Sequence, residues 1–571
     1  MPGESHPDFG MAFLLGEDWF KEEVPVCMKV SVLVFYFLAV LVIGFVARTR
    51  WKSSPEAYFL ADRKLGTWVL LGTMAATNFS AFTVFGTSGA GYRDGYAFFP
   101  IMGFGTGFMA LTFWALGRRI WRVGQERGAV TPPEMIRAVY GSPLLSFVFA
   151  AVMIVFTVPY LALQPMAAGY ALEELVGLPY FTGCILVTGI IVLYTLRGGL
   201  RAVAWTDLFQ GVLMTLLLGI SLILVARYHG GFGAANRTVM ATMPELFSRP
   251  GGLGRYTLSI WFSFMMLWFF CDPMFPQLFQ RFFSAHSEKN IARMMLFYPL
   301  ICTVIFFMPI ALGVLGHLSF PGLTGKQADR ILPMVVNLVS GDLMSALTIA
   351  CGLAALMSTM DSQLLTLSSI FTRDVIPLVT GKGAKGRISG RAFVVLLSLA
   401  GLALAYRPPA TILSIATQTF TGLAVLFPTV IFGLYFKRVH ALPALLSIIV
   451  GEGILVLCYF GLIPTGGFLP IVPVMIGTFS VYLGVHGLLL VRDGVLCIAS
   501  PRWVRDPYFC LFSAIFLLAL DYWAWGRSDP HWAGVPFWLG YFIVLSALQT
   551  LVMMHLVYKR KKTADNYLQG D

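Results

Sequence analysis

Hydrophobic positions occur along this chain in long runs, and short polar segments separate the runs. A helix of about 20 apolar residues, with a rise of about 1.5 Å per residue, crosses the hydrocarbon core of a bilayer. The runs therefore predict about 15 membrane-spanning helices. Their expected ranges are 25–47, 67–92, 96–116, 143–172, 178–197, 203–227, 256–281, 292–317, 341–373, 389–406, 411–436, 440–462, 468–491, 507–527 and 533–557.

Basic residues are distributed unequally between alternate loops. Roughly three quarters of the 40 Lys and Arg residues fall in one set of loops, which begins with residues 48–64. Loops rich in Lys and Arg stay in the cytoplasm. We therefore expect a multi-pass protein of the cell membrane, with the N-terminus outside and the C-terminus, with its basic segment 559–562, in the cytoplasm.

The composition excludes several classes of protein. The chain is 57% hydrophobic and 12% charged, as expected for a helical membrane protein. The formal net charge of +12 lies mostly in one set of loops, so it reports orientation, and no nucleic-acid partner is expected. The eight cysteines form no CxxC pattern, which argues against disulfides and zinc. The sequence contains no P-loop motif, so nothing in it indicates ATP-driven pumping.

The run over residues 67–92 is long enough to span a membrane, but its middle is polar. Its polar residues are Thr73, Thr77, Asn78, Ser80, Thr83, Thr87 and Ser88. Unpaired polar groups are costly in hydrocarbon, so this segment should face protein or a water-filled cavity. A helix interrupted near the midplane exposes carbonyls and hydroxyls that can bind ions and substrate. The alternative is an ordinary helix whose small residues allow close packing.

The run over 341–373 contains a face of candidate cation ligands. Ala355, Ser358 and Thr359 have the spacing i, i+3, i+4, which places them on one side of a helix. Hydroxyl and carbonyl oxygens suit a small hard cation better than metals that prefer sulfur or imidazole. Asp361 lies well inside the same span, where an acid is expensive and is a functional candidate. The alternative is that the hydroxyls bond to their own helix and Asp361 pairs with a neighbour.

A second acid, Asp207, lies in the first turns of the span that follows the basic turn at residues 197–201. It could take part in ion coupling. It could also be a solvated residue at a helix start, where the helix dipole favours an acid.

Four segments carry a resemblance to a known family. They are 198–207 (GGLRAVAWTD) with Gln210, 356–374 (LMSTMDSQLLTLSSIFTRD), 76–80 (ATNFS) with 86–92 (GTSGAGY), and Pro276-Gln277 with Gln280-Arg281. Together they resemble the sodium:solute symporter family, which includes proline, pantothenate, monocarboxylate and sugar symporters. The similarity runs over most of residues 51–440.

The resemblance implies an all-α polytopic membrane protein of the LeuT type, with two five-helix repeats in opposite orientation. The expected division is an N-terminus, leading helix and first loop over 1–66, and a transport core over 67–437. Within the core, the repeats would cover 67–227 and 256–437. About four accessory helices and a short basic tail would follow over 438–571. The broken helices would be 67–92 and 256–281, and prolines in the second give a local cause for its break.

The resemblance also implies the sodium ligands. The sodium ion would be bound by the carbonyls of Ala76, Phe79 and Ala355 and by the hydroxyls of Ser358 and Thr359. Asp207, and also Asp361, are candidates for a second cation site or for coupling the cation to the substrate. This chain departs from the proline symporters in one respect, since they carry Asp at the position of Asn78. Sugar-transporting relatives have Asn there, so sodium binding is still expected.

The candidate substrate contacts lie on the two broken helices and on the fourth span. They are Asn78, Ser80, Thr83, Tyr160, Gln164, Trp268 and Asp272. Glu452 and Asp521 lie in spans outside the core and are interpreted as packing or interface residues. No buried Arg or Lys is expected in the core spans, so no basic group there indicates an anionic substrate.

These observations predict a sodium-driven secondary symporter that imports a small organic solute by alternating access. The substrate is expected to be a monocarboxylate or pantothenate-like acid, then an amino acid such as proline, then a sugar. The expected partners are the solute, the sodium ion and the bilayer, with no cofactor besides the coupling ion and the oligomeric state left open. The alternatives are a membrane sensor that uses a transporter fold and a proton-coupled symporter. An enzyme is not expected, because the sequence shows no nucleophile–base pair or metal cluster.

Overall fold

The computed structural model describes residues 26–47, 54–380, 386–494, 507–529, 531–532 and 534–567. Within these ranges the chain is almost entirely helical, as predicted. One antiparallel pair of short strands, β1 (His531–Trp532) and β2 (Val535–Pro536), joins the last two helices. The expected extracellular N-terminal segment and the end of the basic tail lie outside the described residues.

The long helices follow the predicted spans in order. They are α1 (Val26–Val46), α3 (Thr67–Asn78), α4 (Thr87–Asp94), α9 (Pro143–Val176), α10 (Tyr180–Tyr228), α12 (Leu258–Cys271), α13 (Pro276–Ser284), α14 (Glu288–Leu315), α16 (Asp342–Ile370), α18 (Gly386–Tyr406), α19 (Ile412–Ala424), α20 (Phe427–Tyr435), α21 (Ala441–Tyr459), α22 (Ile471–Arg492), α23 (Pro507–Leu518) and α24 (Phe537–Tyr567). Among the described residues, 10 helices are long and apolar enough to span a membrane, or 12 if each of two bent pairs counts as one span.

The third predicted span is a chain of short helical pieces. These are η4 (Gly95–Phe98), η5 (Pro100–Gly105), α5 (Thr106–Phe108), α6 (Ala110–Thr112), η6 (Phe113–Gly117) and α7 (Arg118–Arg127). Further short helices occupy segments that the hydrophobic pattern marked as loops. They are α2 (Pro55–Leu60), η2 (Ala61–Arg63), α8 (Pro132–Tyr140), α11 (Phe232–Thr242), η7 (Pro244–Phe247), η9 (Gly316–Leu318), η10 (Gly325–Arg330), α15 (Ile331–Val339) and α17 (Ile376–Thr380).

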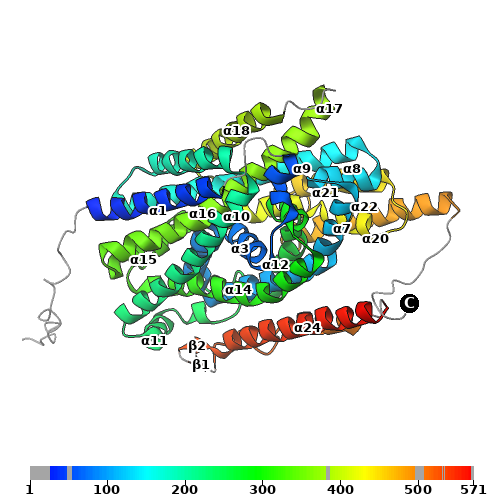
Figure 1. Ribbon diagram of the computed structural model, residues 1–571. Helices are drawn as coiled ribbons and strands as arrows, with labels where there is room; N and C mark the ends of the chain where they lie inside the picture. Colours follow the sequence, from blue (N-terminus) through cyan, green and yellow to red (C-terminus); the bar gives the residue numbers. More distant parts are fainter. Residues whose placement is uncertain are drawn as a thin grey trace, which may run out of the picture.

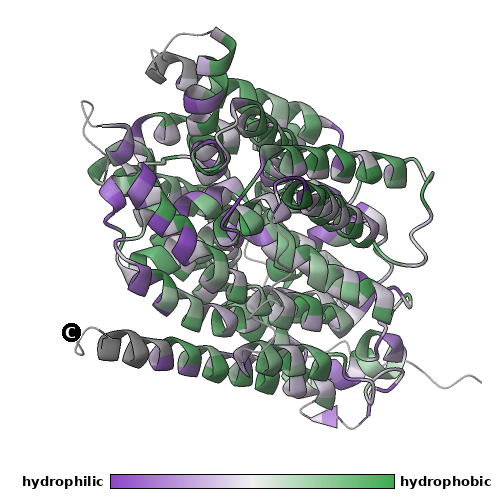
Figure 2. Ribbon diagram, turned by 90° about the vertical axis from the view of Figure 1, so that its right-hand side faces the viewer, coloured by the Kyte–Doolittle hydropathy of each residue, from purple (hydrophilic) through white to green (hydrophobic). Residues whose placement is uncertain are grey.

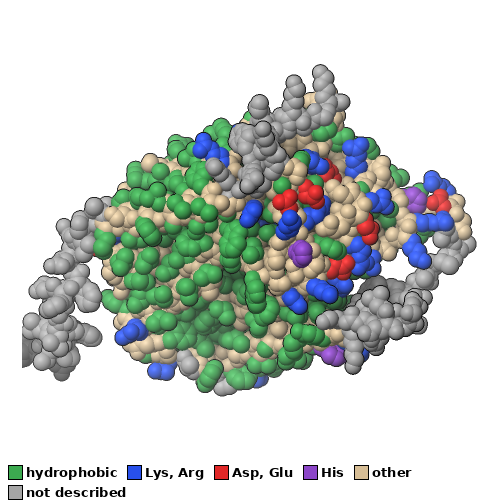
Figure 3. Space-filling view, viewed as in Figure 1, with side chains coloured by type: hydrophobic (Ala, Val, Ile, Leu, Met, Phe, Trp, Pro, Cys, Tyr) green, Lys and Arg blue, Asp and Glu red, His purple; other side chains and the backbone are tan. Residues whose placement is uncertain are grey.

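The helices run side by side in an elongated bundle (Figure 1). In Figure 2, the long helix that leads to the C-terminus, α24, lies along the lower edge of the bundle. Hydrophobic side chains cover the left and middle of the face in Figure 3, and most of its charged side chains gather at the right-hand end, where α7, α8 and α20 lie in Figure 1. This is the surface of a molecule that crosses a bilayer.

Two spans are broken, at the positions expected from the sequence. The axis bends by 60° between α3 and the helical segment Phe82–Phe98, which begins with η3 (Phe82–Gly86), and by 52° between the segment Leu258–Met274 and α13. The first break follows Asn78, where Phe79 adopts the extended angles φ −85° and ψ 90°. The second lies at η8 (Asp272–Met274), between Pro273 and Pro276. Proline has no backbone N–H to donate, which explains why the helix cannot continue there.

A third interruption separates two predicted spans that the structure joins in one helix. The expected spans 178–197 and 203–227 both fall within α10, and Gly199 between them has the non-helical angles φ 68° and ψ 176°. Glycine tolerates a positive φ without a steric penalty. The predicted Gly198–Gly199 turn is therefore a kink within α10.

Candidate functional site

The break at the end of α3 leaves backbone carbonyls without helical partners near the centre of the bundle. In an unbroken helix, each carbonyl accepts from the N–H four residues later. The chain leaves the helix after Asn78, so the last carbonyls of α3 are available to other donors. Helix α16 passes this end of α3 and is buried along most of its length.

Two hydroxyls of α16 point at these carbonyls. Ser358 Oγ donates to the carbonyls of Ala76, at 2.9 Å, and Ala355, at 3.0 Å. Thr359 Oγ1 donates to the carbonyls of Thr77, at 3.0 Å, and Ala355, at 3.3 Å. The hydroxyls thus reach across to α3 as well as back along α16. Four of the five predicted sodium ligands therefore meet at one point.

The fifth predicted ligand, Phe79, is placed by its backbone. It is the first residue beyond α3, and its extended angles turn its carbonyl away from the helix direction. Its ring stacks on that of Tyr298, with centroids 6.2 Å apart, and anchors the break. The carbonyl of Thr77 was not among the predicted ligands. The break position could have indicated it, because Thr77 is also in the last turn of α3.

Asp207 is not a solvated residue at a helix start. Its carboxylate is fully buried, and Oδ2 accepts from Thr73 at 2.5 Å, Thr77 at 3.1 Å and Arg281 at 2.8 Å. Oδ1 has no protein partner. An ion pair with additional hydrogen bonds is the arrangement that a buried charge requires. This acid therefore ties α10 to both broken helices, α3 and α13.

Asp361 belongs to the same polar cluster. Its Oδ2 accepts from the Tyr194 hydroxyl at 2.9 Å, and its Oδ1 accepts from Ser362 at 3.2 Å. Ser362 Oγ in turn lies 2.6 Å from Nη2 of Arg281 and 3.2 Å from Thr77 Oγ1. The two acids that the sequence marked separately are thus linked through one serine and one arginine.

Arg281 corrects an expectation from the sequence, which placed no basic residue inside the core. Its side chain is fully buried and donates to Thr73 at 2.9 Å and to the Gln277 carbonyl at 2.8 Å, in addition to Asp207 and Ser362. Arg281 closes a predicted span, so the hydrophobic pattern assigned it to the loop. In the fold, α13 runs on through the bundle and its end is buried between α3, α7 and α16.

The two breaks face each other through Asn78 and Asp272. The amide Nδ2 of Asn78 donates to the Tyr298 hydroxyl at 2.5 Å and approaches Oδ2 of Asp272 to 3.5 Å. Asp272 is buried, and its carboxyl group has no other hydrogen-bond partner within the described chain. A carboxyl group with so few partners is available to a ligand.

Other predicted substrate residues surround these breaks. Gln164 is fully engaged, since it accepts from the Ala81 N–H at 3.1 Å and donates to the Tyr160 carbonyl at 3.1 Å. Ser80 Oγ accepts from the backbone N–H of Phe82 at 3.2 Å. Thr83 is buried with its hydroxyl unpaired. Gln164 therefore shapes the first broken helix, whereas the Thr83 hydroxyl is free for a ligand.

An aromatic wall completes this region. The Phe420 ring of α19 lies 4.8 Å from Tyr160, 5.6 Å from Trp268 and 4.8 Å from Phe275, measured between centroids. The predicted residues Tyr160 and Trp268 thus meet through Phe420, which the sequence reasoning missed. Trp268 keeps an unpaired indole N–H. No local signal marks Phe420, because its role depends on contacts with distant helices.

Two further buried amides were missed. Gln277 follows Pro276 at the start of α13, and Gln363 lies one turn beyond Thr359 on α16. Both side chains are fully buried, and neither amide has a partner among the described residues. The position of Gln277 directly after a helix break was a signal that could have identified it.

The two acids outside the core differ. Asp521 forms a buried ion pair with Arg249, so it joins the end of α23 to the loop before α12. This fits its interpretation as a packing residue. Helix α23 ends at Leu518, well before the predicted residue 527. Glu452 on α21 has no hydrogen-bond partner within the described residues. Its expected packing role stays a prediction.

Comparison with known sequences places this arrangement in one family. The model of the sodium:solute symporter family matches residues 58–451. The chain is 28% identical over 429 residues to the high-affinity proline transporter PutP of Bacillus subtilis, covering 73% of this chain and 89% of the relative. It is 29% identical over 460 residues to the sodium/pantothenate symporter of Escherichia coli, covering 79% and 94%.

Two solved structures share the fold. A Na+-coupled sialic acid symporter in a substrate-bound outward-open state aligns with a TM-score of 0.64 and 20% identity, over 80% of this chain and 98% of its own. Mhp1, a nucleobase-cation-symport-1 family transporter, aligns with a TM-score of 0.55 and 13% identity, over 79% and 98%. The all-α, LeuT-type architecture is thereby confirmed. With a family match over most of its length, the chain belongs to the sodium:solute symporter family and is a sodium-coupled, multi-pass membrane transporter.

Proposed function

We propose that this transporter imports a small organic solute together with sodium bound between α3 and α16. The observation that carries this proposal is the convergence of the Ser358 and Thr359 hydroxyls on the last carbonyls of α3. Sodium would be held by the carbonyls of Ala76, Phe79 and Ala355 and by these two hydroxyls. Hard neutral oxygen atoms are ligands that suit a small alkali cation.

Sodium binding would join two parts of the molecule that must move relative to each other. In the structure, each hydroxyl donates a hydrogen bond to a carbonyl of α3. A cation would turn these hydroxyls into ligands, so that all the oxygens point at the ion. The ion would thereby hold the broken helix against α16. If it binds more tightly to the conformation that accepts substrate from outside, it shifts the population toward that conformation.

Asp207 and Asp361 are the proposed second cation site or coupling site. When both carboxyls are ionised, the cluster with Arg281 carries a net charge of −1. A buried net charge is costly, so the cluster favours one further cation, either sodium or a proton. The unpaired Oδ1 of Asp207 and the hydroxyl of Ser362 are oxygen atoms that such a cation could use.

The substrate would lie between the two breaks, against Asn78, Ser80, Thr83, Tyr160, Gln164, Trp268 and Asp272. When ionised, the carboxyl of Asp272 would favour a positively charged amine over a second carboxylate, since like charges repel in a medium of low dielectric constant. Of the classes expected from the sequence, an amino acid such as proline therefore fits better than a simple acid. Its carboxylate could face the bound sodium ion. Its relatives include both a proline transporter and a pantothenate symporter, which represent these two substrate classes.

The sodium gradient is sufficient to drive accumulation. One positive charge that crosses 100 mV gains about 2.3 kcal/mol, and a tenfold sodium gradient adds about 1.4 kcal/mol. A single coupled ion could therefore support roughly 500-fold accumulation of a neutral solute.

We further propose the orientation and the division of the chain. The charged end of the molecule in Figure 3 would face the cytoplasm, which agrees with the excess of Lys and Arg in the loops at that end. The N-terminus would then lie outside. The transport core would cover 67–437, with repeats at 67–227 and 256–437, and the helices beyond it would be accessory. A carrier of this kind would catalyse no chemical reaction.

Uptake into proteoliposomes tests this function. Protein reconstituted with an inward sodium gradient is given labelled proline, pantothenate or lactate in turn, and each uptake is repeated with potassium or a proton gradient in place of sodium. Sodium-dependent accumulation of an amine-bearing solute, reduced by Asp272→Asn, is expected. Accumulation driven only by a proton gradient would contradict sodium coupling and indicate a proton-coupled symporter. Saturable binding without accumulation would indicate the sensor alternative.

A further inference from the structure

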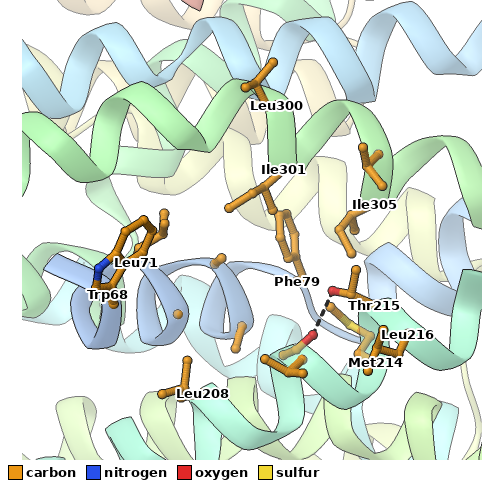
Figure 4. A pocket seen from close by; sticks show the side chains of 16 residues that line it. Trp68, Leu71, Phe79, Leu208, Met214, Thr215, Leu216, Leu300, Ile301 and Ile305 are labelled. Atoms are coloured by element: carbon orange, nitrogen blue, oxygen red, sulfur yellow. Dashed lines mark hydrogen bonds between the residues drawn. The ribbon is translucent and has the colours of Figure 1, made fainter.

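A groove that the transport mechanism does not use opens on the outside of the core. Its walls come from α3, α10 and α14, and its volume is about 520 Å³ (Figure 4). This is within the size range of small-molecule sites in proteins. Of the lining side chains, only Trp68 and Thr215 carry a polar atom, and the Thr215 hydroxyl is satisfied by the Gly211 carbonyl at 2.8 Å. The groove therefore offers an almost purely apolar surface.

The groove faces the bilayer. Leu216 is 60% exposed and Val304 is 54% exposed, and both lie on membrane-spanning helices. At this depth the surrounding medium is hydrocarbon. An apolar groove that opens into the hydrocarbon of a bilayer will be filled by a lipid acyl chain.

Each of two groove walls continues into an exposed arginine at the same end. On α10, Arg201 precedes Trp205 by four residues, and Leu208 and Val212 follow at further intervals of three and four. On α14 the same spacing runs from Arg293 through Phe297 and Leu300 to Val304, so each set forms one stripe along its helix. Both arginines are exposed, and neither guanidinium has a hydrogen-bond or ion-pair partner among the described residues.

The aromatic residues mark the level where the stripes pass from polar to apolar surroundings. The Trp68 and Phe297 rings lie 5.3 Å apart, and Trp205 is 46% exposed. Tryptophan concentrates at membrane interfaces. The three helical segments also begin at this end, at Thr67, after the Gly199 kink and at Glu288, so their positive dipole ends point the same way. The end with the arginines thus suits an anionic headgroup.

We propose that this groove binds an anionic phospholipid of the cytoplasmic leaflet. One acyl chain would fill the groove, and the phosphate would pair with Arg201 and Arg293. The assignment to the cytoplasmic leaflet depends on the proposed orientation of the protein, whereas the proposed lipid binding does not. Ala76 and Phe79 line the groove and are also proposed sodium ligands, so a bound chain would support the broken helix from behind.

The test compares lipids of opposite headgroup charge on the same protein. Purified, delipidated full-length protein is incubated with dioleoyl phosphatidylglycerol or dioleoyl phosphatidylcholine in sodium-free buffer, and bound lipid is measured by native mass spectrometry. Preferential retention of phosphatidylglycerol is expected. Equal retention of the two lipids would overturn the proposal. Because no sodium or substrate is present, this result is independent of the proposed transport function.

Variants locate the site. Val304→Trp, which fills the groove, should abolish the preference, whereas Val155→Trp, at a 61% exposed position on α9 outside the groove, should leave it unchanged. Arg201→Gln and Arg293→Gln should each weaken phosphatidylglycerol binding about fivefold, since a basic residue near anionic lipid contributes about 1 kcal/mol. Arg127→Gln, at an exposed position on α7, is the matched control. Unchanged binding in correctly folded Val304→Trp would refute the groove as the site.

Discussion

The buried charge cluster makes a prediction that distinguishes electrostatics from packing. Arg281 is the only basic member, and its Nη2 lies 2.8 Å from Asp207 and 2.6 Å from Ser362, which also contacts Asp361. Arg281→Gln changes the net charge of the ionised cluster from −1 to −2. Asp207→Asn changes it from −1 to 0. The two substitutions remove the same ion pair, but one makes the net charge of the cluster more negative and the other makes it neutral.

The expected costs follow from these charges. Removal of one partner from a buried ion pair costs about 3–5 kcal/mol when the other charge is left unpaired, which is the case for Arg281→Gln. After Asp207→Asn, the guanidinium keeps Asp361 nearby through Ser362, so the loss should be about 1–3 kcal/mol, typical of impaired buried hydrogen bonds. The double variant restores a net charge of −1 and should cost less than the sum of the single variants by about 0.5–3 kcal/mol.

The assay is the free energy of unfolding of the three variants and the wild type in mixed detergent micelles, in choline chloride so that no small cation binds. Sodium should then recover part of the stability of Arg281→Gln, because the site has become more negative. Equal destabilisation by the two single variants, with strict additivity in the double variant, would refute the electrostatic reasoning. It would indicate that the cluster acts only through shape and packing.

Three other predictions concern separate parts of the molecule. Gly313→Ala should destabilise the protein by about 1–3 kcal/mol, because its Cβ would overlap the Ser88 carbonyl oxygen. Gly189→Ala, where no neighbouring atom lies within 4 Å of the new Cβ, should be neutral or slightly stabilising. The thermal stability of the two variants measures this difference. Burial lowers the pKa of His229, just beyond α10, so its contribution to stability is present above its ordinary pKa of about 6.5 and is lost as the pH falls through the lowered value. His229→Gln should therefore reduce the pH dependence of the melting temperature between about pH 6.5 and pH 5. A pH dependence identical to that of the wild type would contradict this. Asp272→Asn should raise the apparent KM for an amine-bearing substrate more than for a simple carboxylate in competition assays, and an equal change for both would argue against an amine at this position.

The fold was largely predictable because its determinants are long and local. Runs of about 20 apolar residues predict spanning helices regardless of their neighbours, and the breaks at Asn78 and Pro276 follow from local polarity and proline chemistry. Short helices such as α8 and α15 were missed because they lie at the ends of the bundle. Each is nine residues long, too short to span a membrane, and depends on packing against the bundle for its stability.

The candidate site was predictable only in part. The spacing of Ala355, Ser358 and Thr359 places three proposed ligands on one face, and this pattern needs no tertiary information. Arg281 was misplaced because hydropathy cannot distinguish a charged residue at a helix end in water from one paired inside the protein. Phe420 was missed because it acquires its role from Tyr160 and Trp268, which are more than 150 residues away in sequence.

The sodium site is the central element of this account, and one measurement tests it directly. Thermal stability of the purified protein is compared in sodium and in equimolar potassium, for the wild type and for the double variant Ser358→Ala/Thr359→Ala. A ligand present at 100 times its Kd stabilises the folded state by about 2.7 kcal/mol. The account predicts a rise in stability that is specific to sodium in the wild type and absent in the variant. Equal stability of the wild type in the two cations at high concentration, or a sodium-specific rise that the variant retains, would contradict it.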